Sequence, residues 1–350
     1  MNYAREYYYD SEEREGRYPL DEQLGIDGEV SPGVKRLLVK LSARMPYQAG
    51  VDVFEELAQV KVSATTAWEL TQAAGECVRS AQKPIATVAE AGCGETAPEC
   101  MGITMDGCMA NVRTEGWKEV KVGCVFEVVS TEEERTHNKQ GESIPVVHAK
   151  SQSYVLHLGG PEEFGYKLSI EATARGLHAA HESAMLGDAA IWIWNLANKY
   201  YPDSAHIVDW YHAKQHLFSA AQVACLDQPD HAPAWVEQYA DMLYIGQADQ
   251  VAMKLLSLAE CAKSDAKARL ETEAGYFSSN HQRMQYRDFQ LAGLPIGSGT
   301  VESAAKQTKQ RISAAGMRWS RNGLENILPL RAALMSNAFD HLYQVACCPC

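Results

Sequence analysis

The stretch GITMDGCMANVRTEGWKEVKVGCVFEVV, residues 102–129, decides the fold. Apolar and polar residues alternate with the two-residue period of strands through GITMDGCMANVR and again through WKEVKVGCVFEVV, and SYVLHL repeats the pattern at 153–158. Residues 131–142 are charged and contain glycine, so we expect an exposed hairpin tip there. Three successive strands of this kind predict a meander.

Downstream of Pro161 the pattern changes to alternating helices and strands. We expect a helix to about Ala184, a short strand ending at Asp188, an amphipathic helix, and a second short strand ending at Asp209. Residues 215–295 show only helical periodicity, and the glycine-rich segment that closes this region leads into another helix. This order predicts a mixed α/β sheet interrupted by an all-helical insertion.

The sequence pattern predicts that the N-terminal part of the chain is helical. VFEELAQVKVSATTAWELTQAAG, residues 53–75, predicts a helix, a tight turn at 61–63 and a second helix capped by Ser63. Such a helix-turn-helix-like pair can bind DNA or serve only in packing, and both readings stay open. The expected segments are 1–33 (acidic), 34–81 (helical, helix-turn-helix-like DNA-binding region), 82–100 (linker), 101–214 (first part of the core), 215–295 (helical insertion), 296–343 (C-terminal part of the core) and 344–350 (tail).

Composition limits the partners of this 350-residue chain. A hydrophobic content of 46% is enough for cored domains, whereas the net charge of −13 argues against a nucleic-acid partner unless basic residues gather locally. Ten cysteines without a framework spacing predict a reducing cytoplasm. No apolar run approaches the ~18 residues of a membrane helix, so no membrane partner is expected.

Acidic residues stand at the predicted strand ends. With the sheet order 3-2-1-4-5 that is usual for a meander followed by two parallel strands, Asp106 and Asp188 are neighbours and Asp209 lies one strand further out. Glu302 opens a helix after the Gly-Ser-Gly turn at 297–299. Converging carboxylates without cysteine or histidine favour Mg²⁺ or Mn²⁺, and such a cluster can hold two ions about 4 Å apart. Each aspartate taken alone could equally be a turn or cap residue.

A local basic footprint follows Glu302. Lys306 and Lys309 share its helix face, and residues 301–335 hold six basic side chains against two acidic ones. Arg318 and Trp319 could clamp or stack on an unpaired base. The candidate DNA-binding residues are Lys306, Lys309, Arg311, Arg318 and Trp319. The alternative is a solvated, charged helix face.

Several long motifs in order carry a family resemblance. They are TMDGCMANVRTEGWKEVKVGCVFEV, LGDAAIWIWNLANKYYPDSAHIVDWYHAKQHL, YFSSNHQRMQYRDFQLAGLPIGSGTVESAAKQTKQRISAAGMRWS and NILPLRAALMSNAFD, together with YPLDEQLGIDGEVSPGVKRLLVKL near the start. With these motifs the chain resembles DDE transposases of the insertion-sequence Kra group, relatives of Mutator-like transposases. The resemblance covers nearly the whole chain.

The resemblance implies a ribonuclease-H-like catalytic core, with the helical insertion before the last acidic residue. Carried onto this sequence, the triad that would bind metal is Asp106, Asp188 and Glu302, with Asp209 and His212 as supporting residues. The sequence departs from the family at Ala189, where glycine is more frequent.

The expected function is that of a DNA transposase. It would bind two Mg²⁺ or Mn²⁺ ions and use them to cleave and join DNA strands. Its substrates would be terminal inverted repeats and target DNA. It would act as a homodimer or higher assembly in the bacterial cytoplasm. Two alternatives remain: a non-catalytic, truncated or domesticated DNA-binding derivative, and a stand-alone nuclease of the same fold.

Overall fold

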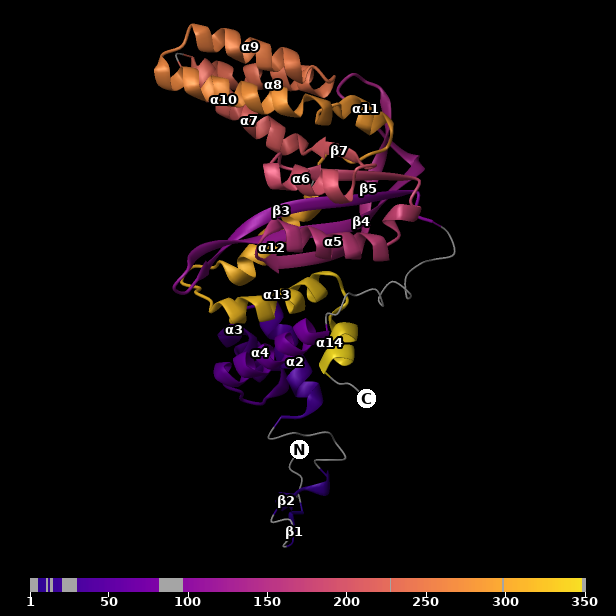
Figure 1. Cartoon of the computed structure of the whole chain (residues 1–350), viewed down its shortest axis with the longest axis vertical. Coiled ribbons are helices and arrows are strands. Elements are labelled where there is room, and N and C mark those ends of the chain that lie inside the picture. Colours follow the sequence, from indigo (N-terminus) through magenta and orange to yellow (C-terminus); the bar gives the residue numbers. More distant parts are fainter. Residues whose placement is uncertain are drawn as a thin grey trace. The chain divides into compact units, whose positions relative to one another are not determined.

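The computed structural model describes residues 6–10, 12, 15–20, 30–81, 97–226, 228–297 and 299–347. These residues fall into two compact units (Figure 1). One unit comprises Met1–Lys83 with Trp319–Cys350, and the other comprises Pro84–Arg318.

A five-stranded mixed sheet forms the centre of the Pro84–Arg318 unit. Its strands are β3 (Cys100–Val112), β4 (Gly116–His137), β5 (Ser143–Leu158), β6 (Glu182–Gly187) and β7 (Ala205–Val208). The order is β5-β4-β3-β6-β7; β3, β4 and β5 pair antiparallel, whereas β6 runs parallel to β3 and β7 parallel to β6. This mixed α/β arrangement has the strand order that the sequence predicts.

The β4–β5 hairpin is longer than predicted. Strand pairing continues to His137 opposite Ser143, so most of the charged segment expected at the tip belongs to the strands. The remaining turn is held by Asn138, whose side-chain oxygen accepts hydrogen bonds from the backbone N–H groups of Gln140 (3.0 Å) and Glu142 (2.9 Å).

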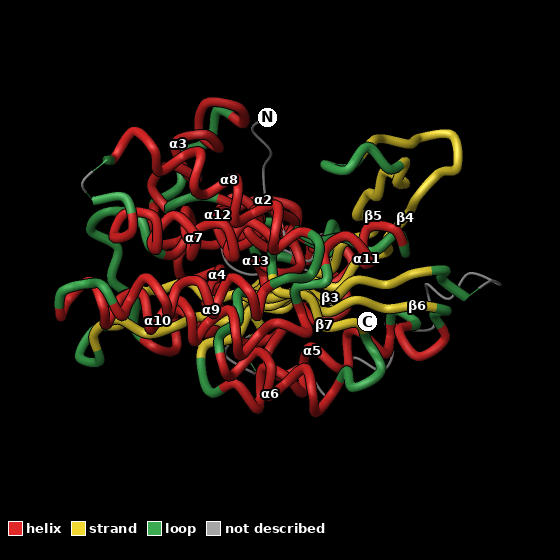
Figure 2. Tube along the Cα trace, turned by 90° about the horizontal axis from the view of Figure 1, so that it is seen from above, coloured by secondary structure: helices red, strands yellow, loops and turns green. Residues whose placement is uncertain are grey.

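Helices cover both faces of the sheet (Figure 2). On one face lie α5 (Pro161–Ala174) and α6 (Ile191–Tyr200), and on the other lies α12 (Gly299–Ile312). A Cβ at Gly123 would stand 2.7 Å from Leu168 of α5, so only glycine allows this close approach. Short 3₁₀ turns are η2 (Leu177–Ala179), η3 (Pro229–His231) and η4 (His281–Arg283).

The predicted end of the first covering helix was wrong. We expected this helix to reach about Ala184, but α5 ends at Ala174, and Ala184 is a buried residue of β6 that pairs with Gly102 of β3. The reason is Gly176, whose left-handed φ of 85° turns the chain after the helix.

The segment between β7 and α12 is helical. It contains α7 (Trp210–Ala224), α8 (Ala232–Tyr244), α9 (Ala248–Glu260), α10 (Ser264–Asn280) and α11 (Tyr286–Leu291). Helix α10 packs against both α7 and α9. Their apolar faces bury aliphatic and aromatic side chains such as Leu217, Leu255 and Phe277.

The other unit is built mainly of helices. Its elements are β1 (Tyr8–Asp10), β2 (Glu15–Arg17), α2 (Pro32–Arg44), α3 (Tyr47–Ala58), α4 (Ala64–Ala81), α13 (Arg321–Met335) and α14 (Phe339–Cys347). Helices α3 and α4 flank the predicted turn, and Ser63 Oγ accepts a hydrogen bond from the N–H of Thr66 at 3.0 Å. Ala74, Val78 and Leu330 share one core with α2 and α14.

The expected segment 296–343 does not stay together. The boundary between the units follows Arg318, because α13 packs its apolar side chains against α2 and α4 rather than extending the sheet unit. Within the predicted linker, residues 82–96 lie outside the described residues, as do 348–350 of the predicted tail. None of the described helices is both long and apolar enough to cross a membrane.

Candidate functional site

The pairing of β3 with β6 brings two predicted aspartates together. Thr104 of β3 is the parallel partner of Leu186 of β6. Asp106 and Asp188 each follow two residues later, so this register sets their backbones level, Asp106 at the middle of β3 and Asp188 directly after the carboxyl-terminal end of β6. Ligand and catalytic residues in open α/β sheets commonly occupy this edge.

Asp209 lies one strand further out and is the N-cap residue of α7. Gly187 is the parallel partner of Val208, and the N–H of Asp209 donates to the carbonyl oxygen of Gly187 at 2.9 Å. Asp209 is 2% exposed, and its carboxylate accepts a hydrogen bond from the N–H of His212 at 2.9 Å, capping the helix. Its orientation is therefore tied to α7, and the role of Asp209 and His212 as supporting residues stays a prediction.

A tight turn holds Asp188 at the end of β6. Its Oδ1 accepts a hydrogen bond from the N–H of Ala190 at 3.0 Å, and α6 begins one residue later. Between them Ala189 adopts a left-handed φ of 73°, a conformation that glycine adopts without strain. The turn that aims the Asp188 carboxylate therefore contains backbone strain.

Asp106 faces the side of the sheet that α12 covers. The neighbouring residue in β3, Met105, pairs with Gly123, whose face packs against α5. Successive residues of a strand point to opposite faces, so Asp106 points away from α5. Its Oδ1 accepts the N–H of Gly107 at 2.6 Å.

The charges around Asp106 show which groups lie near it. Burial is the main cause that raises the pKa of the Asp106 carboxyl above its usual value, and the nearby carboxylates of Asp188 and Glu302 raise it further. The hydrogen bond from Gly107 and the proximity of His212 act in the opposite direction. The structure therefore gathers Asp106, Asp188, Glu302 and His212 within electrostatic reach, and the clustered carboxylates favour a cation.

Glu302 is the least fixed member of this group. It lies in the first turn of α12, its side chain is 48% exposed, and it forms an ion pair with Lys306 at 2.8 Å. Among the described residues, no three histidine, cysteine, aspartate or glutamate side chains are close enough to hold a metal ion. The two aspartates are thus in register, while the third predicted ligand is turned to a lysine.

The predicted DNA-binding residues divide into exposed and buried ones. Lys306, Lys309 and Arg318 are exposed, and Lys309 lies within electrostatic reach of the Cys108 thiol on β3. Arg311 is only 2% exposed, because α12 buries one helical face made of Ala304, Ala305, Thr308, Arg311 and Ile312. The prediction that Arg311 contacts a DNA phosphate was therefore wrong. The helical spacing of these five residues indicates a buried face, and the sequence-based prediction overlooked it.

The prediction that Trp319 stacks on an unpaired base was also wrong. Its side chain is 7% exposed and packs against Tyr47 of α3, with ring centroids 6.5 Å apart at an interplanar angle of 62°. The indole therefore belongs to the core of the helical unit and presents no free face for a base.

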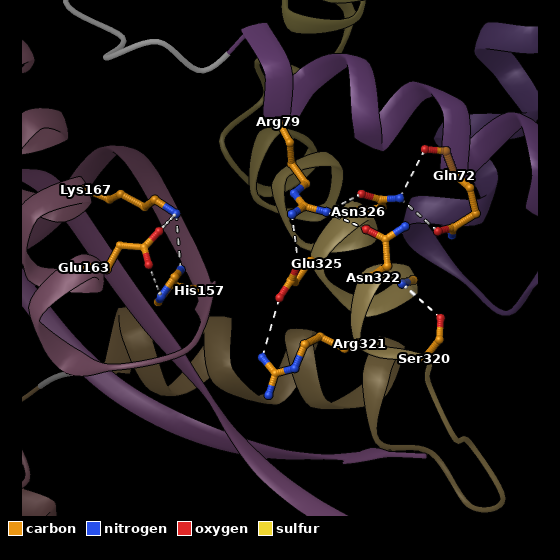
Figure 3. Close-up of polar contacts among 11 residues, drawn as sticks. Gln72, Arg79, His157, Glu163, Lys167, Ser320, Arg321, Asn322, Glu325 and Asn326 are labelled. Atoms are coloured by element: carbon orange, nitrogen blue, oxygen red, sulfur yellow. Dashed lines mark hydrogen bonds and ion pairs between the residues drawn. The ribbon is translucent and has the colours of Figure 1, made fainter. Parts of the chain in front are cut away.

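The surface of the helix-turn-helix pair is acidic. In the fully described range 47–81 the exposed acidic residues are Asp52, Glu55, Glu56, Glu69 and Glu76, and the basic ones are Lys61 and Arg79. Arg79 donates to Glu325 and Asn326 (2.8 Å each) and to Asn322 (2.9 Å) of α13 (Figure 3). Five carboxylates with Lys61 as their main counter-charge favour packing or a protein partner over DNA phosphates.

Sequence reasoning overlooked two tyrosines of the helical segment. Burial, followed by the charges of Asp188 and Asp209, raises the pKa of Tyr276 in α10. Burial, followed by Tyr276 and Asp209, raises the pKa of Tyr286 in α11. Neither stands in a motif, because Tyr276 reaches His216 and Tyr286 reaches Trp210 only through the packing of the helical segment around α7.

One comparison with known proteins gives a match. Residues 177–340 match the sequence model of an uncharacterised protein family (UPF0236), a range that includes Asp188, Asp209 and Glu302 but not Asp106. A comparison with curated proteins gives no match. The chain is thus similar to this family over the matched range, which is compatible with a transposase-related protein.

Proposed function

We propose that the chain is a DDE-type DNA transposase with a ribonuclease-H-like core, which cleaves and transfers DNA strands with the help of divalent cations. The observation that carries the proposal is the pairing of β3 with β6, which sets Asp106 level with Asp188. The charge of Glu302, in the first turn of α12, also acts on Asp106. The strand order and the all-helical segment before Glu302 support the same proposal.

The donor set suits magnesium or manganese. The two level carboxylates provide hard oxygen ligands, and burial around Asp106 disfavours its charge unless a cation compensates it. Two bound ions would activate the attacking oxygen and stabilise the leaving oxygen of a phosphodiester. Glu302 would complete the ligand set when its exposed ion pair with Lys306 opens, an exchange that costs little because such pairs contribute about 0.3–0.5 kcal/mol.

The lysines of α12 would hold the DNA backbone. Lys306 and Lys309 are exposed on the helix that starts at the carboxylates, so they can bind phosphates beside the reacting one. Fixing the phosphate and the attacking oxygen in line would supply a large part of the rate acceleration.

A nicking assay tests the proposal. The full chain is incubated with supercoiled plasmid and Mg²⁺ or Mn²⁺, together with Asp188→Asn, Glu302→Gln, Asp209→Asn and the control Asp203→Asn, an exposed aspartate in the α6–β7 turn. We expect cation-dependent nicking that falls by about 100-fold or more in the first two variants, as when groups that stabilise the transition state are removed. Asp203→Asn should match the wild type.

The alternatives give different results. Plasmid binding without nicking at any cation concentration would establish the non-catalytic DNA-binding derivative. Nicking without joining of a 3′-hydroxyl end would favour the stand-alone nuclease. If Asp188→Asn kept full activity while Asp209→Asn lost it, Asp209 would replace Asp188 as the second ligand.

A further inference from the structure

The helical segment reaches back to the strand ends through α10. Asp209, His212 and His216 share one face of α7 and its cap, at spacings of three and four residues. The His216 ring stacks on Tyr276 of α10 at a centroid distance of 3.5 Å, and His216 Nδ1 lies 2.6 Å from Glu273 Oε2. The face of α7 that starts at Asp209 is therefore the face on which Tyr276 lies.

The Tyr276 hydroxyl is buried and makes no hydrogen bond in the structure. A buried hydroxyl without a partner costs about 1–3 kcal/mol, so such groups are rare in native proteins and call for an explanation. Burial, followed by the charges of Asp188 and Asp209, raises the pKa of this phenol above its usual value. An ordinary phenol is protonated at neutral pH, so the unpaired Tyr276 hydroxyl is available as a hydrogen-bond donor.

A second buried tyrosine, Tyr286, packs against the first residue of α7. Its side chain is fully buried, and its ring meets Trp210, the first residue of α7, edge-on at 4.8 Å. The Tyr286 hydroxyl also lacks a hydrogen-bond partner, and burial, followed by the charges of Tyr276 and Asp209, raises its pKa. Of the two phenols, Tyr276 is the one that stacks on His216, on the face of α7 that begins at Asp209.

We propose that Tyr276 is a positioning residue of the carboxylate site: its hydroxyl donates a hydrogen bond to the Asp188 carboxylate when cation is bound, and so orients the ligand oxygens of Asp188. The inference rests on the proposed function. It gives the helical segment a direct part in the site, because α10 supplies the donor. Groups that orient ligands in this way commonly change metal affinity or activity by about 10–100-fold when removed.

The test compares two tyrosine-to-phenylalanine variants of the full chain. Tyr276→Phe removes the hydroxyl and keeps the ring that stacks on His216, whereas Tyr239→Phe does the same for a tyrosine of α8 stacked on Trp235 at 3.9 Å. Mn²⁺ binding without DNA is measured from the paramagnetic resonance signal of the free ion, and folding is checked by thermal unfolding. We expect the Mn²⁺ dissociation constant to rise about tenfold in Tyr276→Phe and to stay unchanged in Tyr239→Phe.

The outcomes separate this inference from the proposed function. Equal Mn²⁺ affinity in the wild type and Tyr276→Phe overturns the role of Tyr276, whether or not the chain nicks DNA. A wild-type chain that binds Mn²⁺ without nicking overturns the proposed function alone. A wild-type chain that binds no Mn²⁺ overturns both. A loss of affinity in Tyr276→Phe with a melting temperature equal to or above that of the wild type supports the positioning role, since a purely structural loss would lower that temperature.

Discussion

The aspartates and the glutamate of the candidate site are positioned in different ways. Asp106 and Asp188 follow paired residues of adjacent strands, and each carboxylate accepts a backbone N–H hydrogen bond. Glu302 lies in the first turn of a helix, has a half-exposed side chain and is turned to Lys306. The strand half of the site is set by the fold, whereas the helix half is held by a weak contact.

This difference indicates how the site would assemble. Strand register is specified by every hydrogen bond of the ladder, so the two aspartates cannot move independently of the sheet. An exposed ion pair between residues four apart on a helix opens at small cost. Cation binding would therefore change Glu302 first and leave the strand ends almost unmoved.

Gly187→Ala tests the strand half and should have the largest effect. A Cβ at this position, the last of β6, would lie 2.7 Å from Ile193 Cγ2 of α6, so the strand end or the helix must shift. We expect a loss of about 1–3 kcal/mol in the free energy of unfolding, typical of overpacking, and reduced nicking because Asp188 moves. Urea denaturation measures the loss.

The control for this variant is Gly33→Ala in α2, where an added Cβ meets nothing within 4 Å. That change should not lower stability. If Gly187→Ala were as stable and as active as the wild type, the strand end would be more adaptable than its packing indicates.

Ala189→Gly relieves strain next to the same carboxylate. A non-glycine residue in the left-handed region costs about 1–2 kcal/mol, and the added freedom of glycine in the unfolded chain returns about 0.4–1 kcal/mol of this. We expect a net gain of up to about 1 kcal/mol in the free energy of unfolding, seen as a higher urea midpoint. Ala190→Gly, one residue later and without positive φ, should lower the midpoint instead.

The sequence was sufficient for the sheet and insufficient for the side chains around it. Two-residue alternation and the order of elements predicted that Asp106 and Asp188 would be neighbours, because strand pairing follows from local pattern and handedness. A count of basic residues misjudged Arg311, since charge alone does not say which helix face is buried. Tyr276 could not be found at all, because its place depends on how α10 packs on α7, a contact between distant segments.

Lys306→Ala tests the helix half and should have the smallest effect on stability. The variant removes the partner of Glu302, and an exposed pair of this kind contributes about 0.3–0.5 kcal/mol, so the urea midpoint should hardly change. Glu302 no longer needs to leave a lysine before it binds cation, so Mn²⁺ should bind slightly more tightly than in the wild type. Lys309→Ala, which leaves the Glu302 pair intact, is the matched control and should not change Mn²⁺ affinity in this direction. Weaker Mn²⁺ binding in Lys306→Ala would mean that the lysine orders Glu302 for the cation, and the two halves of the site would then be equally preformed.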